Sequence, residues 1–223
     1  MKSAITYTVL ALVNLVAYTV GVALLPASVP IHFDVTLTAD AMGSAWVYLA
    51  FPAAAALISV AVWATALSRN EKNRAVLTGL LSGVGAVFAC IGWIFFALFS
   101  GGVEYGEKVP FPFALAFVLP VSLLIVWLGN YLPRVKPNRL LGIRTRATLN
   151  SEEVWAKTHR LGGVLFFCAG LLSAISAIVF SCVKGNLDLV AVAVLIASLI
   201  VAAIWSAAYA SVLYRREHAE KTE

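Results

Sequence analysis

The sequence predicts an all-α, polytopic membrane protein with six transmembrane helices and both termini in the cytoplasm. Composition is the first observation behind this prediction. Hydrophobic residues make up 61% of the 223 residues and charged residues only 12%, with a mean hydropathy of +0.92. Soluble domains carry about 25% charged residues, so the composition excludes an ordinary soluble fold. The other two observations are the length of the uncharged stretches and the distribution of cations between them.

Six uncharged stretches are each long enough to cross a bilayer, which takes about 20 apolar residues. Helices are the expected conformation because a backbone surrounded by lipid must satisfy its own hydrogen bonds, and no strand-like alternation appears in these stretches. We expect the chain, residues 1–223, to form a single domain. The predicted helices cover residues 4–25, 45–67, 76–99, 111–131, 162–183 and 189–213.

Lys and Arg are distributed unevenly between the two ends of these helices. Fourteen of the sixteen fall at one end, and only Lys108 and Lys184 fall at the other. Cytoplasmic loops are the ones enriched in Lys and Arg, which places both termini in the cytoplasm. The cations at this end outside the long polar loop are Lys2, Arg69, Lys72, Arg74, Arg215, Arg216 and Lys221. Because the charge is divided among separate loops, we predict no direct nucleic-acid partner.

The loop at 26–44 is the longest of the three segments predicted to face the outside. Pro26 and Pro30 favour extended backbone at the residue before each. In an extended chain, His32 and Asp34 would point the same way and Phe33 the opposite way. The segment then forms either a small polar patch that binds a peptide or a cation, or a loop packed on the bundle with Asp34 hydrogen-bonded locally.

The loop at 129–163 is the longest polar segment and carries seven cations. Its first half contains prolines and Gly142 and is expected to be irregular. Its second half is expected to start a helix capped by Asn150, with Glu153 completing a capping box and pairing with Lys157 at i,i+4. On that helix Glu152, Trp155 and His159 share one face. The basic residues of the loop are Arg134, Lys136, Arg139, Arg144, Arg146, Lys157 and Arg160.

Two interpretations of this loop remain open. It is either a specific recognition surface, or an interfacial elbow whose cations meet anionic headgroups and which leads into the fifth helix after Gly162 and Gly163. Generic basic loops have no need of Asn130, Asn138, Gly142, Thr145 or His159, which favours a specific role.

The polar side chains within the predicted helices are uncharged Asn, Ser and Thr. Asn14 is expected to bond a neighbouring helix, and Gly79 with Gly83 forms a GxxxG pattern suited to close helix packing. No Asp, Glu, Lys, Arg or His lies within a predicted span, whereas pumps and ion-coupled transporters usually carry such residues buried in theirs.

No cofactor or metal site is predicted. The three cysteines lie in apolar stretches, and no Cys or His spacing of the zinc type occurs. Glu152 and His159 on one face can be interpreted as acid–base machinery. No nucleophile, metal set or oxyanion arrangement accompanies them, so no enzyme is predicted.

Two runs of residues resemble known families. GNYLPRVKPNRLLGIRT at 129–145 and TLNSEEVWAKTHRLGG at 148–163 closely resemble the signature of the SdpI family of bacterial membrane immunity proteins. LPASVPIHFD at 25–34 resembles a short N-terminal domain of unknown function often found ahead of that signature.

The resemblance implies immunity to a secreted killing peptide at the bacterial cell membrane, and possible signalling by holding a transcriptional autorepressor at the cytoplasmic face. Membrane lipids would be the remaining partners. The toxin-facing candidates are His32, Phe33 and Asp34. The cytoplasmic partner-binding candidates are Asn130, Asn138, Gly142, Arg144, Thr145, Glu152, Trp155 and His159.

Two other classes of function remain as alternatives. The first is a small-molecule or lipid transporter, or another lipid-handling protein, in which the basic loop grips phosphate headgroups. The second is a membrane enzyme that uses the Glu152–His159 face.

Overall fold

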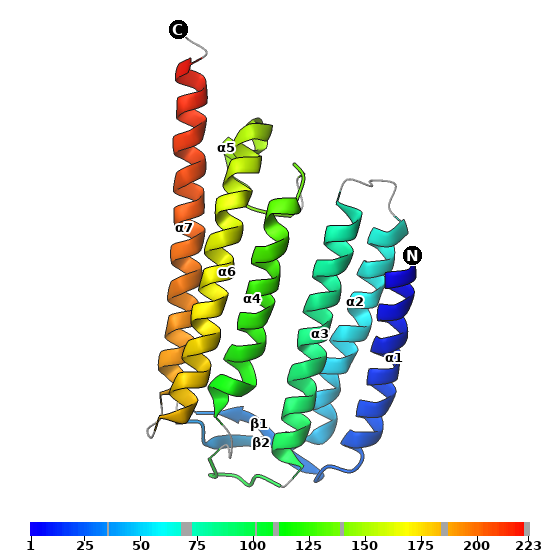
Figure 1. The fold of residues 1–223 in the computed structure, drawn as a ribbon. Coiled ribbons are helices and arrows are strands. Elements are labelled where there is room, and N and C mark those ends of the chain that lie inside the picture. The colour runs from blue at the N-terminus through cyan, green and yellow to red at the C-terminus, as the bar shows by residue number, and fades with distance from the viewer. Residues whose placement is uncertain are drawn as a thin grey trace.

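Six long apolar helices form the computed structural model, which describes residues 1–34, 36–67, 73–100, 102–108, 112–138, 141–183 and 187–220 (Figure 1). Each is long and apolar enough to cross a membrane, so the prediction of six spans is confirmed. The cations Arg69, Lys72, Arg139, Lys184 and Lys221 lie outside the described residues, as does residue 111 of the predicted fourth helix. The helices are α1 (Lys2–Val22), α2 (Ala50–Leu67), α3 (Arg74–Phe99), α4 (Leu119–Tyr131), α6 (Glu152–Cys182) and α7 (Asp188–Glu220). A π-helical turn (Ala114–Val118) and a 3₁₀ turn (Leu132–Arg134) extend α4 to a spanning segment, Ala114–Arg134.

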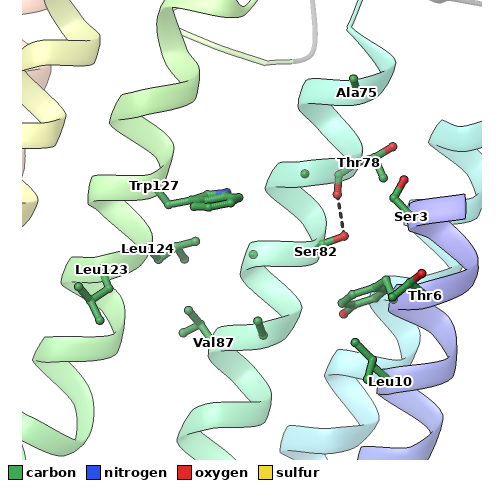
Figure 2. Close-up of a pocket in the computed structure, with 14 residues that line it drawn as sticks. Ser3, Thr6, Leu10, Ala75, Thr78, Ser82, Val87, Leu123, Leu124 and Trp127 are labelled. Carbon is green, nitrogen blue, oxygen red and sulfur yellow. Dashed lines mark hydrogen bonds between the residues drawn. The ribbon is translucent and has the colours of Figure 1, made fainter.

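The helices form two groups. Figure 1 shows α1, α2 and α3 on one side and α4, α6 and α7 on the other. In the first group, Tyr18 donates a hydrogen bond to the Gly92 carbonyl at 2.8 Å, and the Trp93 indole donates to Asn14 Oδ1 at 2.7 Å. The expected bond from Asn14 to a neighbouring helix is therefore confirmed. A groove remains where α1, α3 and α4 meet (Figure 2).

Both termini lie at one end of the bundle, together with the short helix α5 (Arg146–Asn150) (Figure 1). The opposite end carries a two-stranded antiparallel hairpin made of β1 (Ser28–Phe33) and β2 (Ala39–Ser44). Because the number of spans is even, both termini must lie on the same side of the membrane. The polar loop after α4 and the hairpin therefore lie on opposite sides of the membrane.

The hairpin is an element that the sequence analysis left as extended loop. Its register shifts between Pro30 and His32 and again between His32 and Phe33, so side chains do not alternate simply. Val29 is buried in the cluster formed by Tyr18, Tyr48 and Phe99. The Tyr48 hydroxyl also donates to the Pro30 carbonyl. These contacts fasten the hairpin to the ends of α1 and α3.

Two local predictions for the polar loop are wrong. Asn150 is the last residue of α5, and the side chain of Ser151 instead caps α6 by accepting from the Val154 amide. Helix α6 also runs without a break through Gly162 and Gly163, so no elbow separates a surface helix from the fifth span. Both glycines are buried, and an added Cβ would lie 2.3 Å from Ile143 at Gly162 and 2.7 Å from Pro133 at Gly163, so glycine lets the polar loop approach α6. The predicted Glu153–Lys157 pair is confirmed at 2.6 Å.

Candidate functional site

A stretch that we call the strap, residues 135–138 and 141–145 of the polar loop, is fastened to the ends of α3 and α6. The Trp155 indole on α6 donates to the Val135 carbonyl at 2.7 Å. The side-chain amide of Asn73, just before α3, bonds both backbone groups of Lys136. It accepts from the Lys136 N–H at 2.9 Å and donates to the Lys136 carbonyl at 3.1 Å. The strap therefore links the two groups of helices.

His159 anchors the middle of the strap. Its Nε2 accepts from the Ile143 N–H at 3.0 Å, so Nδ1 carries the proton and donates to the Trp155 carbonyl at 2.9 Å. The imidazole also stacks on the Trp155 indole, with ring centroids 4.0 Å apart and planes inclined by 16°. Both side chains are 1% exposed. His159 is thus a neutral, buried acceptor for a backbone amide.

Gly142 allows the strap to approach this ring. Its φ is +109°, a conformation that L-residues rarely adopt, and an added Cβ would lie 2.2 Å from His159 Nε2. Only glycine satisfies both requirements. The Gly142–Ile143 peptide can therefore lie directly on the imidazole.

Asn138 and Thr145 shape the two ends of the strap. Asn138 Oδ1 accepts from the Leu141 amide at 2.7 Å, and its Nδ2 donates to the Lys136 carbonyl at 2.8 Å. Thr145 caps α5 in a reciprocal capping box with Thr148. Thr148 also donates to the Ile143 carbonyl at 2.8 Å. These bonds satisfy backbone groups that an irregular loop would otherwise leave open.

The eight cytoplasmic candidates thus separate into two sets. Asn138, Gly142, Thr145, Trp155 and His159 build the strap. Asn130, Arg144 and Glu152 are exposed. Arg144 forms no hydrogen bond or ion pair with any residue that the structure describes, so its guanidinium is available to a partner.

The structure does not assemble the acid–base pair considered from sequence. Both nitrogens of His159 are bonded to backbone groups, and the ring is buried. Glu152 is exposed at the start of α6. Among the described residues, no hydrogen bond joins the two side chains.

Asn73 is the strap residue that the sequence analysis missed. It stands at the N-cap position of α3, where an asparagine normally accepts from the helix's own amides. Here its side chain makes no cap bond to α3 and is used by Lys136. Only its position before a helix could have drawn attention to it.

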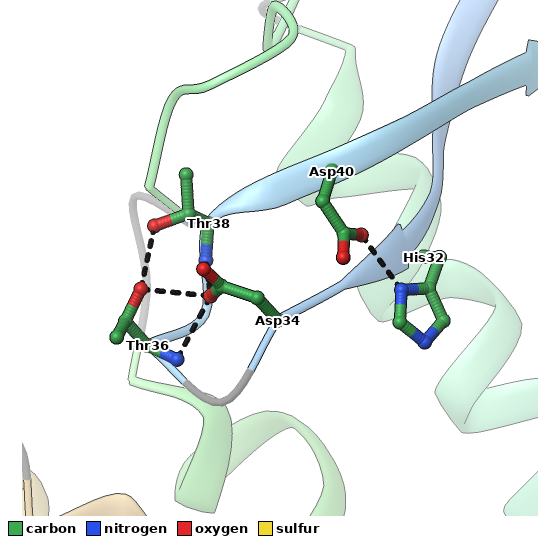
Figure 3. Close-up of polar contacts among 5 residues, drawn as sticks. All are labelled: His32, Asp34, Thr36, Thr38 and Asp40. Atoms are coloured by element: carbon green, nitrogen blue, oxygen red, sulfur yellow. Dashed lines mark hydrogen bonds and ion pairs between the residues drawn. The ribbon is translucent and has the colours of Figure 1, made fainter.

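At the opposite end, the three toxin-facing candidates make separate contacts. Figure 3 shows His32 beside Asp40, and Asp34 with Thr36 and Thr38. The His32 side chain is 69% exposed, and its Nδ1 lies 2.6 Å from Oδ1 of Asp40, a partner that the sequence analysis did not consider. Asp34 belongs to the turn, where its Oδ1 accepts from the Thr36 and Thr38 amides at 2.8 and 2.9 Å. Phe33 stacks on Phe99 with centroids 5.7 Å apart. Of the three, His32 is the most accessible.

The hydrogen bonds within the turn lower the pKa of the Asp34 carboxyl, with the Thr38 amide as the largest cause and the Thr36 hydroxyl next. These bonds therefore stabilise the turn at pH values above the ordinary carboxyl pKa. They are lost as the pH falls through the lowered pKa. Within the described residues, no group of three or more His, Cys, Asp or Glu side chains could hold a metal ion.

Six long apolar helices, with a folded polar loop between α4 and α6, define a multi-pass membrane protein. Residues 134–210 match the model of the SdpI/YfhL protein family, which confirms the SdpI resemblance and assigns this segment to that family. The resemblance of residues 25–34 to a second domain stays a prediction. The matched segment contains the whole strap, α5, α6 and most of α7. No curated protein and no solved structure matches the chain.

Proposed function

We propose that this protein is a membrane immunity protein that protects its producer from a secreted antimicrobial peptide. The observation that carries the proposal is the SdpI/YfhL match over residues 134–210. That segment includes the buried Trp155–His159 anchor, so the matched residues form one folded unit and not a generic basic loop. The proposed role is not an enzymatic one, because His159, the histidine considered for acid–base chemistry from the sequence, is already bonded at both nitrogens.

The proposal places the strap in the cytoplasm and the hairpin outside. This orientation rests on the excess of Lys and Arg at the strap end. His32 then faces the arriving toxin. Arg144, Glu152 and Asn130 face the cytoplasm, where an autorepressor would dock during signalling.

Orientation can be tested with single cysteines in a variant whose Cys90, Cys168 and Cys182 are replaced by alanine. We expect a membrane-impermeant maleimide applied to whole cells to label Tyr105→Cys, because Tyr105 is 70% exposed at the hairpin end. Arg215→Cys, at the other end, should react only after the cells are opened. The opposite labelling pattern would reverse every side-specific role proposed above.

The function itself is tested by survival. A sensitive strain expressing this chain should survive conditioned medium from the protein's native host, while the same strain with an empty vector is killed. Equal killing, with the protein present in the membrane at normal abundance, would reject the immunity proposal.

His32→Ala should weaken that protection without lowering protein abundance, because the ring is exposed and its loss leaves the hairpin's buried contacts intact. Tyr105→Ala is the matched control, since it removes another exposed ring from the same end. The measurement is the toxin dilution at which half the cells survive. Equal curves for His32→Ala and Tyr105→Ala would make His32 an ordinary surface residue.

Arg144→Lys should impair protection or signalling. A guanidinium can grip a carboxylate or phosphate with two parallel bonds, whereas an ammonium cannot reproduce that geometry. Loss of one charge-assisted bond changes an equilibrium about 10- to 150-fold. The control is Arg134→Lys, because Arg134 is exposed in the same loop and its guanidinium lies over its neighbour Tyr131. If cells tolerate both substitutions equally, Arg144 contributes only positive charge.

A further inference from the structure

The groove between the two groups of helices lies on the lipid-facing side of α3 and encloses about 700 Å³. Figure 2 shows α3 as its floor, with Ser3, Thr6 and Leu10 of α1 on one side and Leu123, Leu124 and Trp127 of α4 on the other. Small residues form the floor: Ala75, Gly79, Ser82, Gly83 and Ala86.

The GxxxG pattern on α3 does not bring two helix backbones together. A Cβ added at Gly79 would meet only the Tyr131 ring at 3.6 Å, and one at Gly83 would meet the Trp127 indole at 3.1 Å. At Gly129, by contrast, an added Cβ would lie 2.5 Å from the backbone nitrogen of Phe167. Side chains therefore separate α3 from α4, and the small residues of α3 leave space instead of closing it.

The length of the groove matches one leaflet. Its floor extends from Ala75, next to the first residue of α3, to Val87. This is about 18 Å at roughly 1.5 Å per helical residue. Half of a hydrocarbon core is about 15 Å. A transmembrane peptide helix would need a groove through both leaflets, whereas a single acyl chain needs only this one.

The walls suit an apolar chain. The groove's hydroxyls are largely committed to the protein. Thr6 donates to the Lys2 carbonyl, Tyr7 to the Ala55 carbonyl, and Ser82 to the Thr78 carbonyl. Little hydrogen-bonding capacity remains for a polar ligand.

Two cations flank, in sequence, the lining residues at the end of the groove nearest the termini. Lys2 is the first residue of α1, and Arg74 is the first residue of α3. They adjoin the lining residues Ser3 and Ala75. Both helices also point the positive ends of their dipoles toward this mouth. A phosphate at the mouth would be complementary to this charge, as in the basic pockets between helices that hold anionic lipids.

The geometry points to an anionic phospholipid as the occupant of this groove, with one acyl chain on the α3 floor and its phosphate between Lys2 and Arg74. The site lies mainly outside the family-matched segment and does not depend on the immunity proposal, because survival is not its readout.

The probe is phosphatidylglycerol with a photoreactive diazirine in its acyl chain, at low mole fraction in phosphatidylcholine nanodiscs that contain the full chain. Mass spectrometry of the crosslinked protein should place the label on groove residues, such as Leu10, Val87 and Leu123. Added unlabelled phosphatidylglycerol should displace the label, whereas the same amount of zwitterionic phosphatidylethanolamine should not.

Two variants separate the tail from the headgroup. Ala86→Trp fills the groove from an exposed position and should abolish groove labelling. Lys2→Gln combined with Arg74→Gln should weaken competition by phosphatidylglycerol about 25-fold, since each cation near the surface contributes roughly a five-fold change. Arg215→Gln combined with Arg216→Gln removes the same charge from α7 and should have no effect.

Three results would overturn the assignment: label spread evenly over all lipid-facing helices including α7, equal displacement by the two unlabelled lipids, or equal weakening by the two double substitutions. Any of them would make the groove an ordinary part of the lipid-facing surface.

Discussion

Gly142→Ala is expected to detach the strap from α6. The alanine methyl would lie 2.2 Å from His159 Nε2, and the residue would have to keep a φ of +109°. Left-handed backbone costs a non-glycine residue about 1–2 kcal/mol. Losing the bond from the Ile143 amide leaves buried polar groups unpaired, at about 1–3 kcal/mol. The combined destabilisation is about 2–5 kcal/mol. We expect a lower thermal midpoint in detergent and new protease cleavage within the strap.

Gly106→Ala is the matched control for this prediction. Gly106 has a φ of +83°, but nothing lies within 4 Å of the position its Cβ would take. It therefore isolates the backbone strain from the contact with His159. Combining Gly142→Ala with His159→Ala should cost less than the two single changes added together, because the second change removes the ring that the methyl meets. Equal behaviour of the Gly142 and Gly106 variants, or simple additivity in the double variant, would contradict the proposed anchor.

The six helices could be predicted because hydropathy over about 20 residues is a strong signal, whereas their ends could not. Helices α6 and α7 extend beyond the predicted 162–183 and 189–213 at their charged ends. The sequence predicts a separate surface helix from Asn150 to the glycines at 162 and 163, because this part of the loop is polar. In the structure Ser151 caps one continuous helix, α6, that includes both this polar part and the fifth span.

The hairpin could not be predicted because its strands carry weak signals. β2 reads ADAMGS, which lacks the β-branched and aromatic residues that favour strands. The hairpin is held in place by Val29 and Tyr48, which are buried in one cluster with Tyr18 of α1 and Phe99 of α3. No local pattern in β2 encodes these contacts.

The polar loop was identified correctly as unusual, but residue type alone could not distinguish scaffold from surface. Asn138, Gly142 and His159 have the side chains expected of a binding site. Here they satisfy and position the loop's own backbone. The contact from Asn73 to Lys136 spans 63 residues of sequence, and no local pattern encodes it. The candidates that the structure leaves exposed are Asn130, Arg144 and Glu152.

The contact between α4 and α6 is the other place where one methyl group should have a large effect. At Gly129, a Cβ would lie 2.5 Å from the Phe167 nitrogen and 2.8 Å from the Gly163 carbonyl. At Gly170, a Cβ would lie 2.7 Å from the Val126 nitrogen. In both cases the obstacle is backbone, which cannot rotate away as a side chain can. Helices in membranes pack through close contacts of this kind.

Gly129→Ala should therefore push α4 and α6 apart along their shared face. Overpacking of a tight contact costs about 1–3 kcal/mol and occasionally more, and here the movement would also disturb Pro133, which lies against Gly163. We expect unfolding at a lower fraction of denaturing detergent than for the unmodified protein. Gly79→Ala provides the comparison, because it makes the same change on a neighbouring helix face, where the new methyl would meet the Tyr131 ring at 3.6 Å. That distance is an ordinary contact, so the Gly79→Ala variant should unfold at the same fraction of denaturing detergent as the unmodified protein. If the Gly129 and Gly79 variants unfold at the same fraction of denaturing detergent, the α4–α6 contact is looser than this geometry requires.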